Sequence, residues 1–165
     1  DPIRFLRLVE QVRDNHMDDV HFVLVGDGIL GKEVETYILN KKLQDYVCRI
    51  PYVDNTPRFI GALDGLILTS VYEGMPIVSI EAMCMSVPVF STDTGDLKRF
   101  VEQNCSGQII DNRQSDYHNF EKFYFALSEY KENASRCAAD MLSFFSATHV
   151  AQKYCETFEK GMKKS

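Results

Sequence analysis

The stretch from Thr69 to Pro88 is the feature that most constrains how this 165-residue chain folds. An apolar run, Gly65 to Leu68, stands before it, and the stretch itself reads as a polar loop followed by a short helix. Pro76 suits the first turn of that helix, because its missing N–H would have had no partner inside the helix. The sequence therefore predicts a buried strand over Gly65–Leu68, a loop, and a helix that begins at Pro76.

The residues around Pro76 indicate an anion site with two acids beside it. Gly74 has no Cβ, so a ligand can approach its backbone closely, and the free amides and dipole of a helix N-terminus attract phosphate. Glu73 lies in the loop, and Glu81, inside the helix, leans back toward the helix N-terminus. Carboxylates accept hydrogen bonds from paired hydroxyls and repel phosphate. The predicted ligand therefore carries both phosphates and sugar hydroxyls.

Short apolar runs alternate with helical patterns along most of the chain. Strands are expected at His21–Val25, Val47–Ile50, Gly65–Leu68, Val87–Ser91 and, at an edge, Gly107–Ile110. Helices are expected at Ile3–Asn15, Leu30–Lys41, Arg58–Leu63 after an N-cap at Thr56, Pro76 onward, and Asp96–Glu102. This alternation predicts a doubly wound parallel sheet. Ligands of such sheets bind at the carboxyl ends of the strands, so the loops there are expected to face one crevice.

The two ends of the chain depart from this alternation. A βα fold seldom begins with a helix, so a strand is expected upstream of Asp1. From Tyr117 onward the pattern is helical, with helices expected at Phe120–Tyr130, Ala134–Phe144 and Ala147–Lys164. The last of these carries Val150, Tyr154 and Phe158 on one stripe and ends in lysines, which suit a helix C-terminus.

Two glutamates separated by seven residues carry a resemblance to a known family. Glu73 and Glu81, with Gly74 and Pro76 between them, resemble the EX7E signature of the retaining glycosyltransferases of GT-B fold, the group 1 family. The run from Val23 to Gly28 resembles that family's second-strand Gly-Asp-Gly turn, and the run from Val87 to Asp93 resembles the strand after its donor-site helix. The match runs from about Leu6 to the C-terminal helix.

The resemblance implies an α/β fold and a set of site residues. The chain would be one nucleotide-sugar-binding domain over residues 1–165, the C-terminal half of a GT-B fold, with a Rossmann-like doubly wound parallel sheet and extra C-terminal helices. Glu73 would be catalytic and bind the donor sugar, and Glu81 would bind the ribose hydroxyls. The implied donor-binding residues are Gly26, Gly28, Tyr52, Val53, Glu73, Gly74, Met75, Pro76, Ile77 and Glu81.

Several of these residues have a second interpretation. Gly26 and Gly28 are expected either to let the backbone approach the diphosphate or simply to form the tight turn of a βα unit. Tyr52 and Val53 are expected either beside the nucleobase or as plain wall residues. Arg49 is expected either to pair with an acid or to reach phosphate, although a solvated charge is the more common outcome.

The reaction implied by the resemblance is hexosyl transfer from a nucleoside-diphosphate sugar to an acceptor hydroxyl, in polysaccharide or glycan biosynthesis. The family needs no bound metal, and no cofactor is expected. Its usual basic pair and its acceptor domain would lie upstream of Asp1, so the isolated chain is expected to bind donor weakly and to transfer nothing. A cytoplasmic location is expected, with membrane contact only through the missing half.

Composition excludes some classes of protein. The net charge of -6 argues against a nucleic-acid surface. No apolar run approaches the 18 residues of a membrane span. The five cysteines show no Cys-x-x-Cys spacing and are expected to be small buried hydrophobes in a reducing compartment. The four histidines are scattered without metal-ligand spacing, and no metal site is expected.

Two other functions remain open at this stage. A nucleotide-sugar epimerase shares the GT-B architecture, although the two-glutamate helix favours a transferase. A flavodoxin-like interaction module is the non-enzymatic alternative. A phospho-receiver of that kind would carry Asp at the end of a central strand, whereas Thr69 and Ser70 follow Leu68 here.

Overall fold

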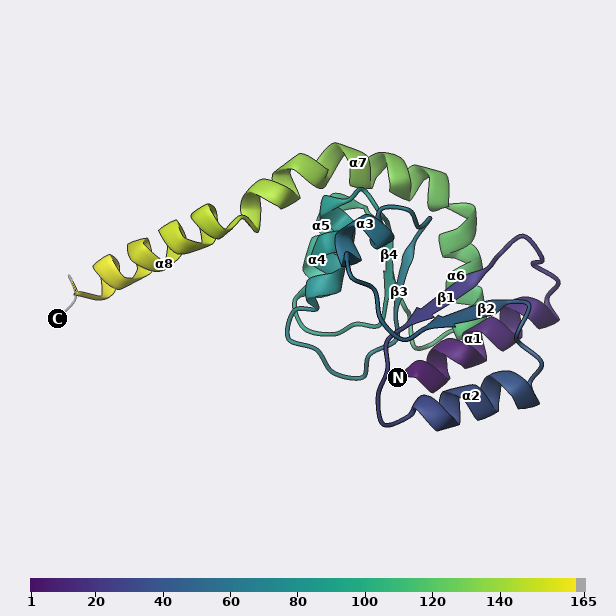
Figure 1. Cartoon of the computed structure of the whole chain (residues 1–165). Coiled ribbons are helices and arrows are strands. Elements are labelled where there is room, and N and C mark those ends of the chain that lie inside the picture. Colours follow the sequence, from purple (N-terminus) through teal and green to yellow (C-terminus); the bar gives the residue numbers. More distant parts are fainter. Residues whose placement is uncertain (163–165) are drawn as a thin grey trace.

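The computed structural model describes residues 1–162, in which strands and helices alternate before the chain ends in three helices (Figure 1). The strands are β1 (Phe22–Val25), β2 (Val47–Ile50), β3 (Leu66–Leu68), β4 (Val89–Ser91) and β5 (Gly107–Ile109). The helices are α1 (Pro2–Asp14), α2 (Gly31–Asn40), α3 (Thr56–Ile60), α4 (Ile77–Cys84), α5 (Leu97–Asn104), α6 (Asp116–Phe125), α7 (Leu127–Phe144) and α8 (Ala147–Met162). All five expected strands and the expected helices between them are present, which confirms the predicted α/β pattern.

The strands are parallel and pair as two sheets. β1 pairs with β2, with Phe22 opposite Val47. In the second sheet β4 lies between β3 and β5, and Val89 is opposite both Leu66 and Gly107. β5 is an edge strand, as predicted. Within residues 1–162 no strand joins β1 to β3, so the single sheet expected from the sequence is divided between these two strands.

Strand β4 lies between the two hydrophobic cores. Phe90 packs its ring against Phe120 and Phe123, at centroid distances of 5.9 and 5.3 Å. The neighbouring Val89 points to the other face and belongs to a core with Leu97, as alternation along a strand requires. All three β4 residues are buried because the strand has a neighbour on each side and helices on each face.

The first helix covers the two-stranded sheet with the apolar stripe expected from its periodicity. Leu6, Val9 and Val12 are fully buried in the core that includes β1 and β2. Glu10 ties α1 to α2, because it accepts hydrogen bonds from the Tyr37 hydroxyl and the Lys41 ammonium, both at 2.6 Å.

Several helix boundaries lie one or more residues from the prediction, and two of these differences concern a capping residue. Thr56 is not the N-cap of α3: Asn55 is, since its side chain accepts from the Arg58 amide at 3.1 Å. Both residues are good caps, and sequence alone does not rank them. Pro76 is extended, with ψ of 116°, and caps α4, so that helix begins one residue later than predicted, at Ile77.

The break expected between residues 130 and 134 is absent from the helical region that the structure describes. The chain bends instead at Ala126, between α6 and α7, and this bend lets Tyr130 stack on Phe123 with centroids 5.6 Å apart. Residues 131–133, which separate the two expected helices, lie on α7, where Asn133 donates to the Cys105 carbonyl at 3.2 Å.

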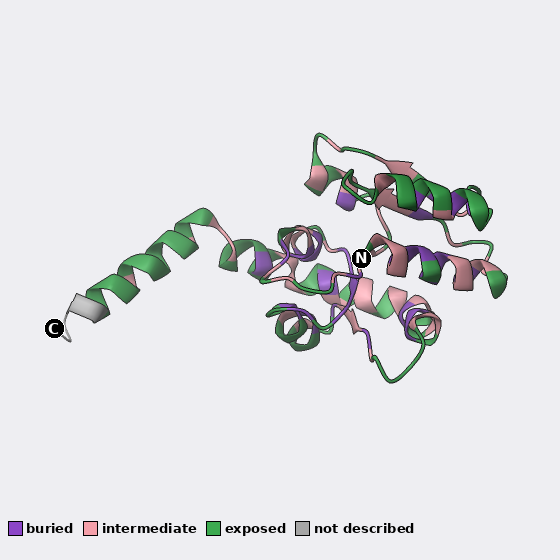
Figure 2. Ribbon diagram, turned by 90° about the horizontal axis from the view of Figure 1, so that it is seen from below, coloured by how far each residue is buried: buried purple, intermediate pink, exposed green. Residues whose placement is uncertain are grey.

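Helix α8 extends away from the rest of the molecule (Figure 1). Figure 2 shows it almost wholly exposed, in contrast to α1. Its expected stripe of Val150, Tyr154 and Phe158 is solvent-exposed. Lys163 and Lys164, expected in this helix, lie outside the described residues. Among residues 1–162, no helix has both the length and the apolar character needed to cross a membrane.

The expectation that the cysteines are buried is wrong. Cys48, Cys105 and Cys155 are exposed, Cys84 and Cys137 are partly buried, and all five are free thiols. Cys48 alternates outward on β2, and Cys105 occupies the left-handed C-cap position of α5, so local geometry exposes both.

Candidate functional site

The loop between β3 and α4 is held to the turn that follows β4. The Thr92 hydroxyl donates to the Ser70 carbonyl at 2.7 Å. The Ser70 hydroxyl in turn donates to a carboxylate oxygen of Glu73 at 2.9 Å. Because β3 and β4 are adjacent parallel strands, their following loops meet at one edge of the sheet. These bonds fix the position of Glu73.

Gly95 supports the backbone of this loop from the neighbouring turn. Its φ is +55°, a conformation that favours glycine, and a Cβ placed on it would lie 1.7 Å from the Gly74 carbonyl oxygen. The Asp96 amide donates to that same oxygen at 3.3 Å. Only glycine fits at position 95, and its contact aligns the carbonyl of Gly74.

The N-terminus of α4 presents unpaired amides. Among residues 1–162, the amides of Gly74, Met75, Ile77 and Val78 donate to no protein acceptor. Ser79 closes the first turn, with its amide and hydroxyl both bonded to the Pro76 carbonyl. Ile77 is 71% exposed, and a Cβ on Gly74 would meet nothing within 4 Å, so solvent reaches this surface. Open amides at a helix N-terminus form an anion site.

Both glutamates of the site are partly buried. Glu73 lies on the loop before α4 and accepts from Ser70, whereas Glu81 lies on the helix itself. Burial, and then the nearby charge of Glu81, raises the pKa of the Cys84 thiol, which keeps that thiol protonated beside the glutamate. Two carboxylates and a set of free amides suit a ligand that carries both hydroxyls and phosphate.

The Gly26–Gly28 turn belongs to the other sheet. The Gly26 amide donates to the Ile50 carbonyl at 2.9 Å, and Gly26 has a φ of +125°. Asp27 accepts from the Gly28 amide at 2.9 Å and from Arg49 at 3.0 Å. Arg49 also pairs with Glu35, and its side chain is only 18% exposed. The expectation of a solvated charge is therefore wrong, because two acids engage the guanidinium.

A groove of about 780 Å³ runs beside this turn. It is lined by Asp27, Gly28, Ile29, Gly31, Lys32, Glu35, Ile38, Leu39, Gln44, Val47, Arg49 and Pro51. Tyr52 and Val53 follow it on the loop after β2, where Tyr52 is 74% exposed and Val53 is half-buried. This part of the predicted site is therefore open, and in its walls Arg49 pairs with Asp27 and Glu35.

The predicted residues thus form two groups. Glu73 to Glu81 lie at the carboxyl end of the three-stranded sheet, and Gly26, Gly28, Tyr52 and Val53 lie at that of the two-stranded sheet. The sequence reasoning missed three residues that hold the first group, Ser70, Thr92 and Gly95. The turn containing Thr92 and Gly95 was expected at the correct place, but its contact with the Glu73 loop has no sequence signature.

Comparisons with known proteins agree with this architecture. Residues 3–122 match the family described as Glycosyl transferases group 1. A Salmonella typhi protein, the Vi polysaccharide biosynthesis protein VipC/TviE, is 32% identical over 100 residues, which are 61% of this chain and 17% of that protein. An Escherichia coli UDP-Gal:alpha-D-GlcNAc-diphosphoundecaprenol alpha-1,3-galactosyltransferase is 25% identical over 117 residues, 70% of this chain and 30% of that protein. The chain thus spans a third or less of the length of these relatives.

Solved structures show the same fold. The structure of Anabaena HepE in complex with UDP-glucose aligns with a TM-score of 0.80 and 21% identity, covering 97% of this chain and 46% of that one. The chain has the fold of one half of a GT-B glycosyltransferase, with parallel strands, flanking helices and additional helices at the C-terminal end. Because the family match covers most of its length, the chain belongs to the group 1 family of glycosyl transferases.

Proposed function

We propose that this chain is the donor-binding part of a retaining glycosyltransferase and that a nucleoside-diphosphate sugar binds at the N-terminus of α4. One observation carries the proposal: the free amides of Gly74, Met75, Ile77 and Val78 are flanked in the sequence by Glu73 and Glu81, on a loop that Gly95 supports. Free amides bind phosphate, and carboxylates accept hydrogen bonds from sugar hydroxyls. A nucleotide sugar carries both groups.

Each predicted residue has a role in this proposal. The amides of Gly74, Met75 and Ile77 bind the sugar and the distal phosphate, and Pro76 sets the direction in which α4 begins. Glu73 orients the donor sugar, and Glu81 binds the ribose hydroxyls. The turn at Gly26 and Gly28 accommodates the diphosphate, and Tyr52 and Val53 lie beside the base.

The reaction we propose breaks the bond between the anomeric carbon and the diphosphate and forms one from that carbon to an acceptor hydroxyl on the same face. The chain's own contribution is to hold the leaving diphosphate with backbone dipoles and to orient the sugar, and neither requires a metal. The resemblance of the Glu73 to Glu81 motif to EX7E is the support for retention of the anomeric configuration. Transfer of a hexose in polysaccharide biosynthesis accords with the names of the Escherichia coli and Salmonella relatives. The cytoplasm is the location that we propose for this reaction.

Transfer assays on the whole protein test this proposal. Nucleotide sugars are offered with lipid-linked and oligosaccharide acceptors, and the anomeric configuration of the product is read by NMR. We expect retained configuration, and a loss of kcat/KM of at least about 100-fold in Glu73→Gln and Glu81→Gln, because each removes a charge-assisted hydrogen bond to the donor. Glu159→Gln, on the exposed face of α8, is the matched control and should match the wild type. An inverted product, or two glutamate variants as active as the control, would contradict the proposal.

The isolated chain gives a second test. In this proposal the acceptor is bound by a domain upstream of Asp1, so we expect residues 1–165 alone to bind donor weakly and to transfer nothing. Formation of an epimeric nucleotide sugar by the whole protein in the absence of acceptor would instead support the epimerase alternative. Transfer by residues 1–165 alone would show that the acceptor site lies within this chain.

A further inference from the structure

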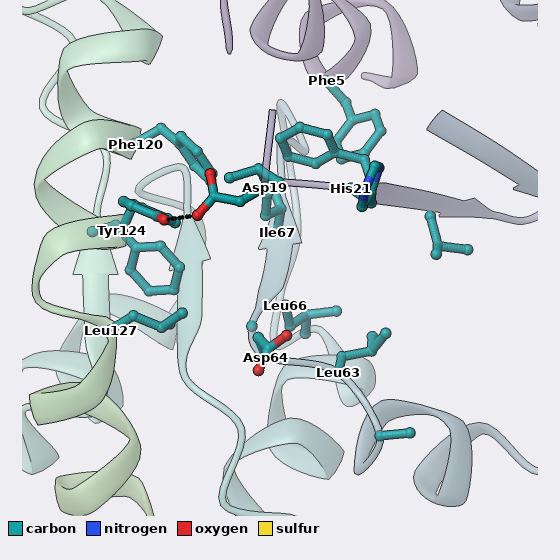
Figure 3. Close-up of a pocket in the computed structure, with 16 residues that line it drawn as sticks. Phe5, Asp19, His21, Leu63, Asp64, Leu66, Ile67, Phe120, Tyr124 and Leu127 are labelled. Carbon is teal, nitrogen blue, oxygen red and sulfur yellow. Dashed lines mark hydrogen bonds between the residues drawn. The ribbon is translucent and has the colours of Figure 1, made fainter. Parts of the chain in front are cut away.

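The two ends of strand β3 differ in their surroundings. At its start a cavity of about 270 Å³ lies between β3 and β1, and Figure 3 shows Leu66 and Phe120 among the side chains that line it. After its end, the loop of residues 69–73 lies at the carboxyl edge of the sheet, in the candidate site. Val71 and Tyr72 form the tip of this loop and are 83% and 88% exposed. Among residues 1–162, no Phe or Tyr side chain is more exposed than that of Tyr72.

The tip has a fixed position because the residues on both sides of it are bonded. The Thr92 hydroxyl donates to the Ser70 carbonyl at 2.7 Å, and the Ser70 hydroxyl donates to the Glu73 carboxylate at 2.9 Å. After Glu73, the Gly74 carbonyl accepts from the Asp96 amide at 3.3 Å. A backbone held in this way loses little freedom when a ligand binds, so more of the contact energy appears as affinity. The tip is therefore suited to binding.

The tip has the chemistry of a sugar-binding surface. It carries no charge, and no Lys or Arg occurs between Gly65 and Leu97, so no basic side chain of this stretch attracts an anion. The Tyr72 ring offers an apolar face and a polar hydroxyl at its edge. A sugar ring has the same two features, an apolar face of C–H groups and a rim of hydroxyls. A neutral sugar ring is therefore the ligand that matches the tip.

The donor, as placed in the proposed function, leaves the tip without an occupant. Its phosphate uses the amides that follow Glu73, its sugar and ribose use Glu73 and Glu81, and its base lies beside Tyr52 on the other sheet. The tip precedes Glu73 in the loop and is assigned to no part of the donor. The reaction has one further substrate, the acceptor, which must place a hydroxyl beside the sugar that Glu73 orients. Because Tyr72 is the residue next to Glu73, a ring that stacks on it belongs to the acceptor.

We propose that Tyr72 is an acceptor-binding residue and that it stacks on the ring of a neutral saccharide that carries the accepting hydroxyl. Val71 extends the apolar surface of the tip beside it. The tip forms one wall of the acceptor site, and other parts of the whole protein form the remainder. This inference rests on the proposed function and deepens it, because it names the class of acceptor and a residue of this chain that recognises it.

Steady-state transfer by the whole protein tests the role of Tyr72. The acceptors are the oligosaccharides of the transfer assay, the methyl and octyl glycosides of glucose, galactose and N-acetylglucosamine, and glycerol as an acyclic alcohol. In Tyr72→Ala we expect the KM of the saccharide acceptor to rise about tenfold, the effect of losing one aromatic contact. The kcat and the KM of the donor should stay within about twofold, because the contact is the same in the ground state and the transition state.

Matched variants and acceptors separate the ring contact from other causes. Tyr72→Phe keeps the ring and removes only the hydroxyl, so the KM of the acceptor should stay within about threefold of the wild-type value. Phe125→Ala removes another exposed ring, at the end of α6, and should match the wild type. The methyl and octyl glycosides of one sugar should show the same rise in KM in Tyr72→Ala, because they share the sugar ring.

Four kinetic results would overturn this inference and leave the proposed function intact. The first is an unchanged KM of the acceptor in Tyr72→Ala. The second is a raised KM of the donor, which would assign Tyr72 to the donor site. The third is a rise confined to octyl glycosides, which would mean that the ring contacts an alkyl chain. The fourth is transfer to glycerol but to no saccharide.

Thermal unfolding of the whole protein distinguishes acceptor binding from packing between parts of the protein. We expect the unfolding midpoint of Tyr72→Ala to lie within about 1 °C of the wild-type value, because the ring is exposed. A midpoint lowered by more than about 4 °C would show that Tyr72 packs inside the whole protein, and this result would also overturn the inference. Absence of transfer to every acceptor by the wild type would contradict the proposed function itself, and this inference with it.

Discussion

Two glycine turns at the carboxyl ends of the two sheets differ in what surrounds them. Gly95, after β4, would place a Cβ 1.7 Å from the Gly74 carbonyl oxygen, whereas Gly28, after β1, would place one where nothing lies within 4 Å. The first glycine is required by protein packing. The second has no packing requirement, and this leaves room for a ligand to approach its backbone. Glycine therefore supports the Glu73 loop beside the three-stranded sheet. Beside the two-stranded sheet it leaves the turn open to a ligand.

Gly95→Ala tests the packed side of this comparison and should have the largest effect. The new methyl group collides with the backbone of the Glu73 loop, and the residue keeps a positive φ that alanine disfavours. We expect the free energy of unfolding to fall by about 2 to 4 kcal/mol, measured by urea denaturation. A loss below about 0.5 kcal/mol would show that the loop relaxes easily and is not fixed by Gly95.

Arg49→Met tests what holds the open turn. Arg49 pairs with Asp27 and Glu35, but both carboxylates are largely exposed. We expect a loss of about 1 kcal/mol in the free energy of unfolding, because solvent screens such pairs. The matched control is Arg136→Met, which breaks the exposed pair with Glu132 on α7 and should change stability by less than about 0.5 kcal/mol. Equal losses in the two variants would mean that Arg49 has no special role at the turn.

Alkaline pH should weaken the helix pair that covers the two-stranded sheet. Burial, and then the hydrogen bond to Glu10, raises the pKa of Tyr37 from 10.0 to about 12. The folded state thus favours the protonated hydroxyl, so this stabilisation is complete below pH 10 and is lost as the pH rises from 10 to about 12.

We expect the effect at Tyr37 to be less than about 1 kcal/mol, because the hydroxyl is partly solvated. Urea denaturation across this pH range should show a downward slope that Tyr37→Phe reduces. If Tyr37→Phe has the same slope as the wild type, the bond between Tyr37 and Glu10 is not the source.

Gly28→Ala tests the open side and should have the smallest effect on stability. Its Cβ meets no atom, so we expect the free energy of unfolding to change by less than about 0.5 kcal/mol. Donor affinity should nevertheless fall by about tenfold, or 1.4 kcal/mol, if the turn approaches the diphosphate. Unchanged affinity in calorimetric titration would support the other interpretation of Gly28, a turn residue without contact to ligand.

Much of the fold could be predicted from the sequence because its signals are local. The apolar runs that became β1 and β4 are bounded by glycine, proline and polar residues, and the stripe of Leu6, Val9 and Val12 on α1 has helical spacing. The sequence does not fix the start of a helix where neighbouring residues are equally good N-caps, as Asn55 and Thr56 are. The bend at Ala126 brings Tyr130 against Phe123, a contact that no local pattern encodes.

The candidate site was predictable only in part for the same reason. Glu73, Gly74, Pro76 and Glu81 lie within nine residues of one another, so their relation is visible in the sequence. The support from Gly95 comes from the turn after another strand, β4, and the division into two sheets depends on which strands pair. Such long-range contacts require the structure.

NMR titration of the labelled chain with UDP, GDP and ADP and with their sugars tests the central claim most directly. We expect one nucleotide series to shift the amides of Gly74, Met75 and Ile77, with smaller shifts at Gly28, and Glu81→Ala to abolish these shifts while Glu159→Ala retains them. If no nucleotide shifts the Gly74 loop, either in this chain or in the whole protein, then α4 does not hold the donor and the account of this site is wrong.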